Sequence, residues 1–187
     1  MGDPKRQRKL WEAPYKRWDK ARILEEAAIM RTYGLKSKRE LWRAKAELRR
    51  IRATARRLLA ATGPEKEKRQ KELLDRLYRL GLLPENATLD DVLTLDVRDL
   101  LERRLETVVW RKGLARTVWQ ARQFIVHGHV YVNGRRVTVP SYWVKRGEEK
   151  TVELDPEILA VLKEEEKHAP VEVEGAVEPQ TAGEVNG

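Results

Sequence analysis

The sequence predicts an α+β protein with three parts: a mainly helical N-terminal region, a small helix–helix–antiparallel-hairpin module, and a disordered acidic C-terminal tail. Apolar residues recur at helical spacing through the first two-thirds of the chain. Alternation with period two begins only after residue 128, and large apolar residues become scarce after residue 168. These three observations place the divisions at 1–96, 97–167 and 168–187.

Capping residues and glycines set the expected helix boundaries. Asp19 is expected to cap a helix that ends near Tyr33. A long helix should follow from Ser37 to about Ala61, because Ser37-Lys-Arg-Glu40 has the spacing of a capping box. The same signals predict helices over residues 64–80, a short turn of helix from Thr88, one helix from Asp96 through Lys112, and another over residues 118–127.

A small antiparallel sheet is expected after the last of these helices. Residues 129–132 alternate between apolar and polar side chains. Asn133-Gly134 is a favoured two-residue turn of type I′, since both positions of that turn take positive φ. Residues 135–139 should return as the second strand and end before Pro140. Residues 151–154 are a candidate for a third short strand.

The charge of the chain is strongly uneven. Its 187 residues hold 39 Lys and Arg against 30 Asp and Glu, a net charge of +9. Residues 1–57 contain 19 basic and 7 acidic residues, whereas residues 148–187 contain 3 basic and 12 acidic residues. The acidic end therefore hides a charge of +18 on the rest of the chain. A surplus of this size favours a polyanionic partner, with nucleic acid as the first candidate.

Composition and motifs exclude several other classes. No apolar run is long enough for a membrane span, and the N-terminus lacks the apolar core of a signal peptide, so we expect a cytoplasmic protein. Cys is absent, which excludes disulfides and thiolate chemistry. His127 and His129 have no third metal ligand nearby, and Asp90, Asp91 and Asp96 suit helix N-termini. We therefore predict no enzyme, no cofactor and no metal.

Two cationic surfaces are candidates for nucleic-acid binding in the N-terminal region. The first eighteen residues interleave charges with aromatics, which is typical of an extended arm that contacts phosphates and bases. One face of the long helix carries arginines at helical spacing with almost no acid among them, although a merely solvated face remains the alternative. The candidate residues are Lys5, Arg6, Arg8, Lys9, Trp11, Arg17, Arg39, Arg43, Arg50 and Arg57.

The helix and hairpin over residues 116–146 form a third candidate surface. Between Thr107 and Glu153 the only acids are Glu148 and Glu149. A metal site at the two histidines and a purely structural role for the turn asparagine are the competing interpretations. The cationic and polar candidates are Arg116, Arg122, Gln123, His127, His129, Asn133, Arg135, Arg136, Lys145 and Arg146.

Residues 113–147 resemble the RNA-binding module named after small-subunit ribosomal protein four. The signature runs through Ala121-Arg-Gln, His127-Gly-His-Val, Val132-Asn-Gly and Pro140-Ser-Tyr. The N-terminal MGDPKRQRKLWEAPYKRW and the stretch YGLKSKRELWRA are similar to the archaeal and eukaryotic branch of that ribosomal family. The resemblance covers nearly the whole chain except the acidic tail.

The resemblance implies a structural protein of the small ribosomal subunit. Such a protein would clamp a junction of ribosomal RNA (rRNA), help to organise assembly of the subunit body and contribute to translational accuracy. Its implied partners are small-subunit rRNA, small-subunit protein five and messenger RNA near the entry channel. Arg116, Arg122, Arg135, Lys145 and Arg146 would neutralise phosphates, and Gln123, Asn133, Ser141 and Tyr142 would bond to 2′-hydroxyls or base edges.

Two other functions and one departure from the family pattern remain open at this point. An RNA-modifying enzyme of the pseudouridine-synthase kind could use the same module as its grip, but it would need a catalytic domain that the preceding helices do not suggest. A DNA regulator would need an operator-reading motif that we do not find. The family usually has Gly-Asp before its last strand, whereas this chain has Gly147-Glu148-Glu149-Lys150, so the loop there is expected to differ.

Overall fold

The computed structural model describes residues 9–168, and the chain divides into two compact units between Asp155 and Pro156. The first unit holds a three-stranded sheet of β1 (Val130–Val132), β2 (Arg135–Arg136) and β3 (Val152–Leu154). The second contains α8 (Pro156–His168), a helix that the sequence did not predict, and the predicted disordered tail lies outside the described residues from 169 onward. The helices of the first unit are α1 (Lys20–Thr32), α2 (Lys38–Ala60), α3 (Pro64–Arg79), α4 (Leu89–Thr94), α5 (Val97–Glu102), α6 (Leu105–Arg111) and α7 (Val118–His127).

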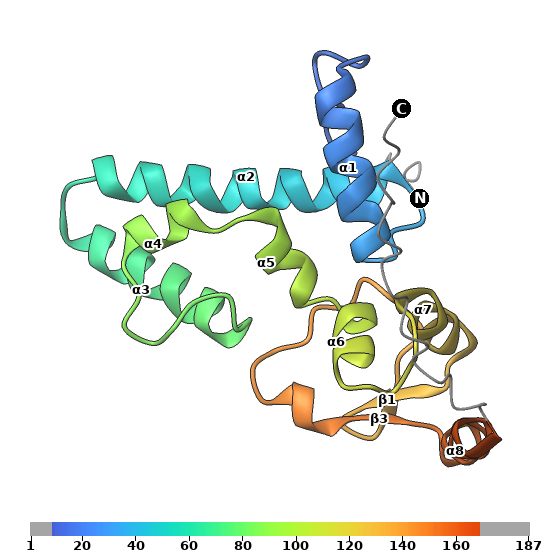
Figure 1. The fold of residues 1–187 in the computed structure, drawn as a ribbon. Coiled ribbons are helices and arrows are strands. Elements are labelled where there is room, and N and C mark those ends of the chain that lie inside the picture. Colours follow the sequence, from blue (N-terminus) through green and yellow to red (C-terminus); the bar gives the residue numbers. More distant parts are fainter. Residues whose placement is uncertain (1–8, 169–187) are drawn as a thin grey trace, which may run out of the picture. The chain divides into compact units, whose positions relative to one another are not determined.

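The N-terminal helices pack around α2, the longest described helix (Figure 1). α1, α3, α4 and α5 all contact it. The buried face of α2 meets Leu77 of α3, Val92 of α4 and Leu101 of α5 in one apolar core. The predicted apolar stripe is confirmed, because its members are all buried: Leu41, Ala44, Leu48, Ile51, Ala55 and Leu58.

The module has a second group of buried residues, drawn from α6, α7 and the sheet. β1 lies between β2 and β3 and is antiparallel to both, with Tyr131 opposite Arg136 and Val130 opposite Leu154. The predicted turn is confirmed, since Asn133 and Gly134 have φ values of 51° and 70°. The second strand is shorter than predicted, because the chain leaves the sheet after residue 137 to reach the junction of α5 and α6.

The helix predicted from Asp96 through Lys112 is broken at Arg103 and Arg104. Arg104 has an extended backbone and forms an isolated antiparallel bridge with Trp143. The carbonyl of Arg103 accepts a 3.0 Å hydrogen bond from the amide of Val144. These long-range bonds replace the helical bonds that would have carried the helix through the junction. A single helix was therefore wrong, and the partners that break it lie 40 residues further along the chain.

Helix capping differs from the prediction at Ser37. Thr88 and Asp91 form the expected capping box of α4. Ser37 does occupy the N-cap position of α2, but its side chain makes no capping hydrogen bond. The carboxylate of Glu40, which would complete the box, instead pairs with Arg104 and Arg122. Residues with local capping spacing are thus used for a tertiary contact.

Gly34, which follows α1, lies against Val118 at the start of α7. Its φ is 60°, and a Cβ there would lie 2.7 Å from Cγ1 of Val118. Gly113 has a similar φ of 73°, but a Cβ there would meet no atom within 4 Å. We expect Gly34→Ala to lower the free energy of unfolding by about 2 kcal/mol and Gly113→Ala by about 1 kcal/mol, because only the first adds crowding to backbone strain. Urea denaturation measures both, and equal losses would contradict the close approach.

Candidate nucleic-acid interface

A cleft of about 930 Å³ is lined by residues of α2, α3 and α5 together with residues of the module. Arg43 and Arg50 of α2 line it together with Ser141 and Lys145 of the module. The structure thus brings together predicted site residues that are about 100 positions apart in sequence. Charged residues of both signs line the cleft, with cations in excess: Arg43, Arg50, Arg76, Arg79, Arg104, Arg122 and Lys145 against Glu40, Glu47, Glu72 and Asp75.

The sequence analysis missed the contribution of α3 to this cleft. Arg76 and Arg79 were passed over because the charges of α3 are mixed, and a mixed helix usually indicates a solvated face. Their spacing of three residues places them on neighbouring positions of one helical face. That spacing was the available signal. Arg76 approaches Glu47 of α2 at 4.0 Å, at the outer limit of an ion pair.

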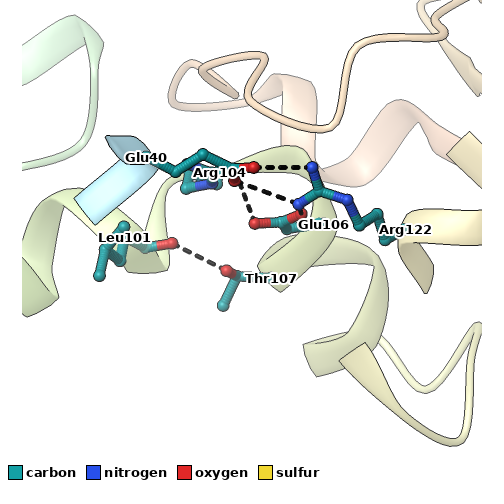
Figure 2. Close-up of polar contacts among 6 residues, drawn as sticks. All are labelled: Glu40, Leu101, Arg104, Glu106, Thr107 and Arg122. Carbon is teal, nitrogen blue, oxygen red and sulfur yellow. Dashed lines mark hydrogen bonds and ion pairs between the residues drawn. The ribbon is translucent and has the colours of Figure 1, made fainter. Parts of the chain in front are cut away.

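Glu40, Arg104, Glu106 and Arg122 form a four-residue ion cluster (Figure 2), and all of them except Glu106 line the cleft. Arg122 of α7 donates to Glu40 of α2 at 2.8 Å and to Glu106 of α6 at 3.1 Å. Arg104, at the start of α6, approaches the same two carboxylates at 2.9 and 2.7 Å. The cluster therefore ties the long N-terminal helix to two helices of the module.

The pKa values of the two carboxylates in the ion cluster shift in opposite directions. Glu106 is 0% exposed, and burial raises its pKa to about 7, although Arg104 and Arg122 oppose the shift and Glu40 adds to it. Burial alone would also raise the pKa of Glu40. There the hydrogen bonds and charges of Arg122 and Arg104 outweigh burial, so the pKa of Glu40 falls below its ordinary value.

This geometry changes the interpretation of Arg122. The sequence analysis expected it to neutralise an RNA phosphate. Its side chain is only 18% exposed, and its guanidinium is shared between two carboxylates. Arg122 therefore pairs with two carboxylates of the protein itself and holds α2, α6 and α7 together.

The N-terminal arm is described only from Lys9 onward, so Lys5, Arg6 and Arg8 lie outside the described residues. Trp11 packs against Trp42 of α2 with ring centroids 5.6 Å apart. The ammonium of Lys9 lies 4.0 Å from the Trp11 ring centroid. Arg39 also approaches that ring, at 5.7 Å. Trp11 and its cationic neighbours thus anchor the arm on α2.

The cations of α2 have more partners than the sequence indicated. Glu26 of α1 pairs with Lys45 at 3.3 Å, and Glu12 of the arm pairs with Arg49. The helix itself supplies Glu47 for Arg50. The sequence argument considered only acids within the helix, and two of these partners come from other segments. Within residues 9–168, Arg43 and Arg57 are exposed and form no ion pair.

Several predicted residues of α7 and the hairpin face outward. Gln123, His127 and Arg135 are exposed, as is Arg116 just before α7. Arg136 is exposed too, but it donates a 2.7 Å hydrogen bond to the carbonyl of His127. These side chains form the outer surface of the module.

The two histidines are neighbours across the end of α7. The rings of His127 and His129 lie 6.4 Å apart at an interplanar angle of 24°. Nδ1 of His129 is 3.7 Å from a carboxylate oxygen of Asp155. Gly128 between them takes a left-handed conformation with φ of 81° as the C-cap of α7. Over the described part of the chain, no three His, Cys, Asp or Glu side chains are grouped as a metal site.

Asn133 and Arg146 make contacts within the protein. Oδ1 of Asn133 accepts a 2.6 Å hydrogen bond from the hydroxyl of Thr151. Arg146 donates to the carbonyl of Leu83 at 3.0 Å, and its guanidinium lies 4.3 Å from the ring centroid of Tyr78. The structure thus assigns Asn133 to the turn and Arg146 to the contact between the module and the segment after α3.

The loop that departs from the family pattern forms a short 3₁₀ helix over Glu148–Thr151. Glu148 accepts hydrogen bonds from the hydroxyl of Tyr142 at 3.2 Å and from the amide of Lys145 at 3.0 Å. Glu149 pairs with Arg103. The two additional acids therefore find cationic or polar partners inside the chain, and Tyr142 is engaged by one of them.

None of the helices in residues 9–168 is long and apolar enough to cross a membrane.

Comparisons with known proteins cover both halves of this interface. Residues 4–102 match the model of the ribosomal protein S4/S9 N-terminal domain, and residues 103–150 match that of the S4 domain. Proteins called small ribosomal subunit protein uS4 are similar over 83% of this chain. The relative from Ignicoccus hospitalis is 56% identical with 94% of its length covered, and those from Sulfurisphaera tokodaii and Hyperthermus butylicus are 50% and 51% identical with 89% covered. The chain therefore belongs to the uS4 family of small ribosomal subunit proteins, whose members are structural components of the ribosome and not enzymes.

Proposed function

We propose that this protein clamps small-subunit rRNA in the cleft between its N-terminal helices and its module, as a structural constituent of the cytoplasmic ribosome. One observation carries the proposal: cations from two distant parts of the chain line a single cleft. A junction of RNA helices presents phosphates on more than one side, so it suits a cleft of this kind better than a flat surface does. We expect residues 1–96 to form the N-terminal rRNA-binding region and residues 97–167 to form the RNA-binding module.

The ion cluster supports the clamping part of the proposal. Two cationic surfaces bind a folded RNA more tightly when their separation is already set, because less conformational freedom is lost on binding. The ion pairs of Arg122 and Arg104 with Glu40 and Glu106 hold α2 against α6 and α7. We infer that the protein presents both surfaces in a preformed arrangement.

The family resemblance supports the wider parts of the proposal. These are early binding to rRNA, organisation of the subunit body, a contribution to translational accuracy, and contacts with small-subunit protein five and with messenger RNA near the entry channel. An RNA-modifying enzyme is not favoured, because the two matching family models and the similar relatives are those of small-subunit ribosomal proteins.

Salt dependence of binding tests which cations contact phosphate. Arg135 is exposed on β2 and has no ion pair within the described chain, so Arg135→Ala should reduce the slope of log K against log salt by about 1. Arg69 of α3 is exposed but paired with Glu65 at 2.8 Å, which makes Arg69→Ala a matched control with little expected change. Filter binding to a transcript of small-subunit rRNA at several salt concentrations provides the slopes.

The proposal itself is tested by comparing RNAs with wild-type protein. We expect tight binding to the small-subunit rRNA transcript and much weaker binding to an unrelated duplex RNA at physiological salt. Equal affinity for the two RNAs would remove the specific version of the proposal. An unchanged slope for Arg135→Ala would remove that residue from the phosphate contacts while leaving the cleft in place.

A further inference from the structure

The aromatic residues of the N-terminal arm divide into one that packs inward and two that face solvent. Trp11 packs on Trp42, as described above. Tyr15 and Trp18 are 99% and 93% exposed, more than any other large apolar side chain described. Large aromatic side chains normally bury most of their surface in the core or in an interface. Two almost fully exposed aromatics, three residues apart, therefore require a binding partner as their explanation.

The segment that carries these two side chains is held in place by defined contacts. Residues 15–18 form a bend and a turn, which we call the aromatic turn. The guanidinium of Arg22 donates to the carbonyls of Lys16 at 2.8 Å and Arg17 at 2.9 Å. Asp19, directly after the turn, caps α1 through a 3.2 Å hydrogen bond from the amide of Ala21. The backbone of the turn is thus fixed on the start of α1.

The same arginine connects the aromatic turn to α2. Its other terminal nitrogen donates to Glu26 at 2.9 Å, and that carboxylate is 1% exposed. Glu26 also accepts from Nε1 of Trp42 at 3.2 Å and from Lys45 at 3.3 Å. Arg22 therefore bridges a surface turn and a buried carboxylate that is itself satisfied by two residues of α2. A mobile terminus would not need such support.

The charges around the aromatic turn indicate the chemistry of its partner. Lys16, Arg17 and Lys20 are exposed and lie within or next to the turn. None of the three forms an ion pair with another residue in the described range 9–168. Exposed aromatic faces interleaved with unpaired cations match single-stranded RNA, whose bases stack on the rings while its phosphates contact the cations. A purely apolar protein partner would leave these cations without acceptors.

We propose that Tyr15 and Trp18 form a stacking platform for unpaired bases of RNA, separate from the cleft. The proposal rests on the proposed function, since it assumes that the partner of the protein is rRNA. It adds two residues that the sequence analysis did not select and gives them a different mode of contact from the arginines. Stacking depends on the ring faces, so it responds to loss of the aromatic group and not to salt.

The test uses the full chain and a transcript of small-subunit rRNA, with binding measured over a range of salt. We expect Trp18→Ala and Tyr15→Ala each to weaken binding by about 5- to 100-fold, with the slope against salt unchanged. Trp18→Phe and Tyr15→Phe, which keep an aromatic face, should retain most of the affinity. Leu24→Ala is the matched control, because it removes another exposed apolar side chain from α1 without removing a ring.

Chemical probing of the RNA separates stacking from other contacts. Nucleotides that wild-type protein protects and Trp18→Ala leaves reactive should be unpaired in the free RNA. Wild-type affinity in both alanine variants would overturn the platform, as would a loss of protection only at base-paired nucleotides. If the variants bind RNA normally but fail to recruit other small-subunit proteins in reconstitution, the surface belongs to a protein partner and the inference is wrong. Failure of wild-type protein to bind the transcript would instead overturn the proposed function.

Discussion

Replacing Arg122 by Ala is expected to lower the free energy of unfolding by about 3–5 kcal/mol. The substitution removes the bidentate partner of Glu40 and leaves Glu106, which has no exposed surface, with Arg104 alone. Breaking one side of such an ion pair costs more than the pair contributes, because the remaining carboxylate stays out of water and must either keep an uncompensated charge or take up a proton. Chemical denaturation followed by circular dichroism measures the loss.

Two companion variants separate this explanation from a loss of packing alone. Arg135→Ala on β2 should change stability by less than about 0.5 kcal/mol, because that side chain is exposed. Adding Glu106→Gln to Arg122→Ala should recover part of the loss, because it removes the buried charge that Arg122 had balanced. If the free energy of unfolding of Arg122→Ala lies within about 1 kcal/mol of the wild-type value, the ion cluster does not stabilise the fold. Weak RNA binding by Arg122→Ala would then indicate a direct contact between Arg122 and the RNA.

The second large effect is a dependence of stability on pH that runs against the usual direction for an ion-paired carboxylate. The pKa of Glu106 is about 7 in the folded protein, against an ordinary value of 4.5. Between these two pH values the folded state keeps a proton that the unfolded state has released. Stability from this group is therefore complete below about pH 4.5 and declines as pH rises to about 7, by about 3 kcal/mol in total.

Glu106→Gln isolates this contribution, because Gln has a similar shape and does not titrate. We expect wild type to lose about 3 kcal/mol of stability relative to the variant between pH 4.5 and pH 7. Glu40 acts in the opposite direction, because its pKa is lowered in the folded protein. It adds stability at pH values above its ordinary pKa, and that stability is lost as the pH falls. Because Glu40 is present in both proteins, much of its effect cancels in the difference. A difference that stays flat with pH, or that grows in favour of wild type, would show that Arg104 and Arg122 outweigh burial at Glu106.

Local signals in the sequence predicted most of the elements, and tertiary contacts account for the errors. Asp19, Thr88 and Gly128 mark helix ends as expected, because caps depend on residues within one turn. The prediction of a single helix over the α5–α6 region was wrong because its break is made by backbone hydrogen bonds with residues 142 and 144. A pattern of apolar spacing contains no information about a partner so far along the chain.

The candidate site was predicted in composition more than in arrangement. The sequence singled out Arg122 as a cation, but only the fold shows that its partners are Glu40, 82 residues away, and Glu106, 16 residues away. Conversely, Tyr15 and Trp18 lie in the same arm as Trp11, and nothing in their spacing distinguished the half-buried ring from the two exposed ones. Burial of an aromatic residue in an irregular segment depends on what packs against it, which was Trp42 in this case.

The ion cluster also constrains the order of events while the chain is being synthesised. Glu40 leaves the exit tunnel long before Arg104 and Arg122, so the start of α2 has to wait for about 80 further residues before its acidic side chain finds both partners. During that interval the newly made N-terminal helices lack the contacts with α6 and α7 that hold them in their final position. Domains generally fold as units as they emerge, from the N-terminus onward. In this protein the final fit of the first region depends on residues of the second, so the cleft takes its mature form only when the module has been made.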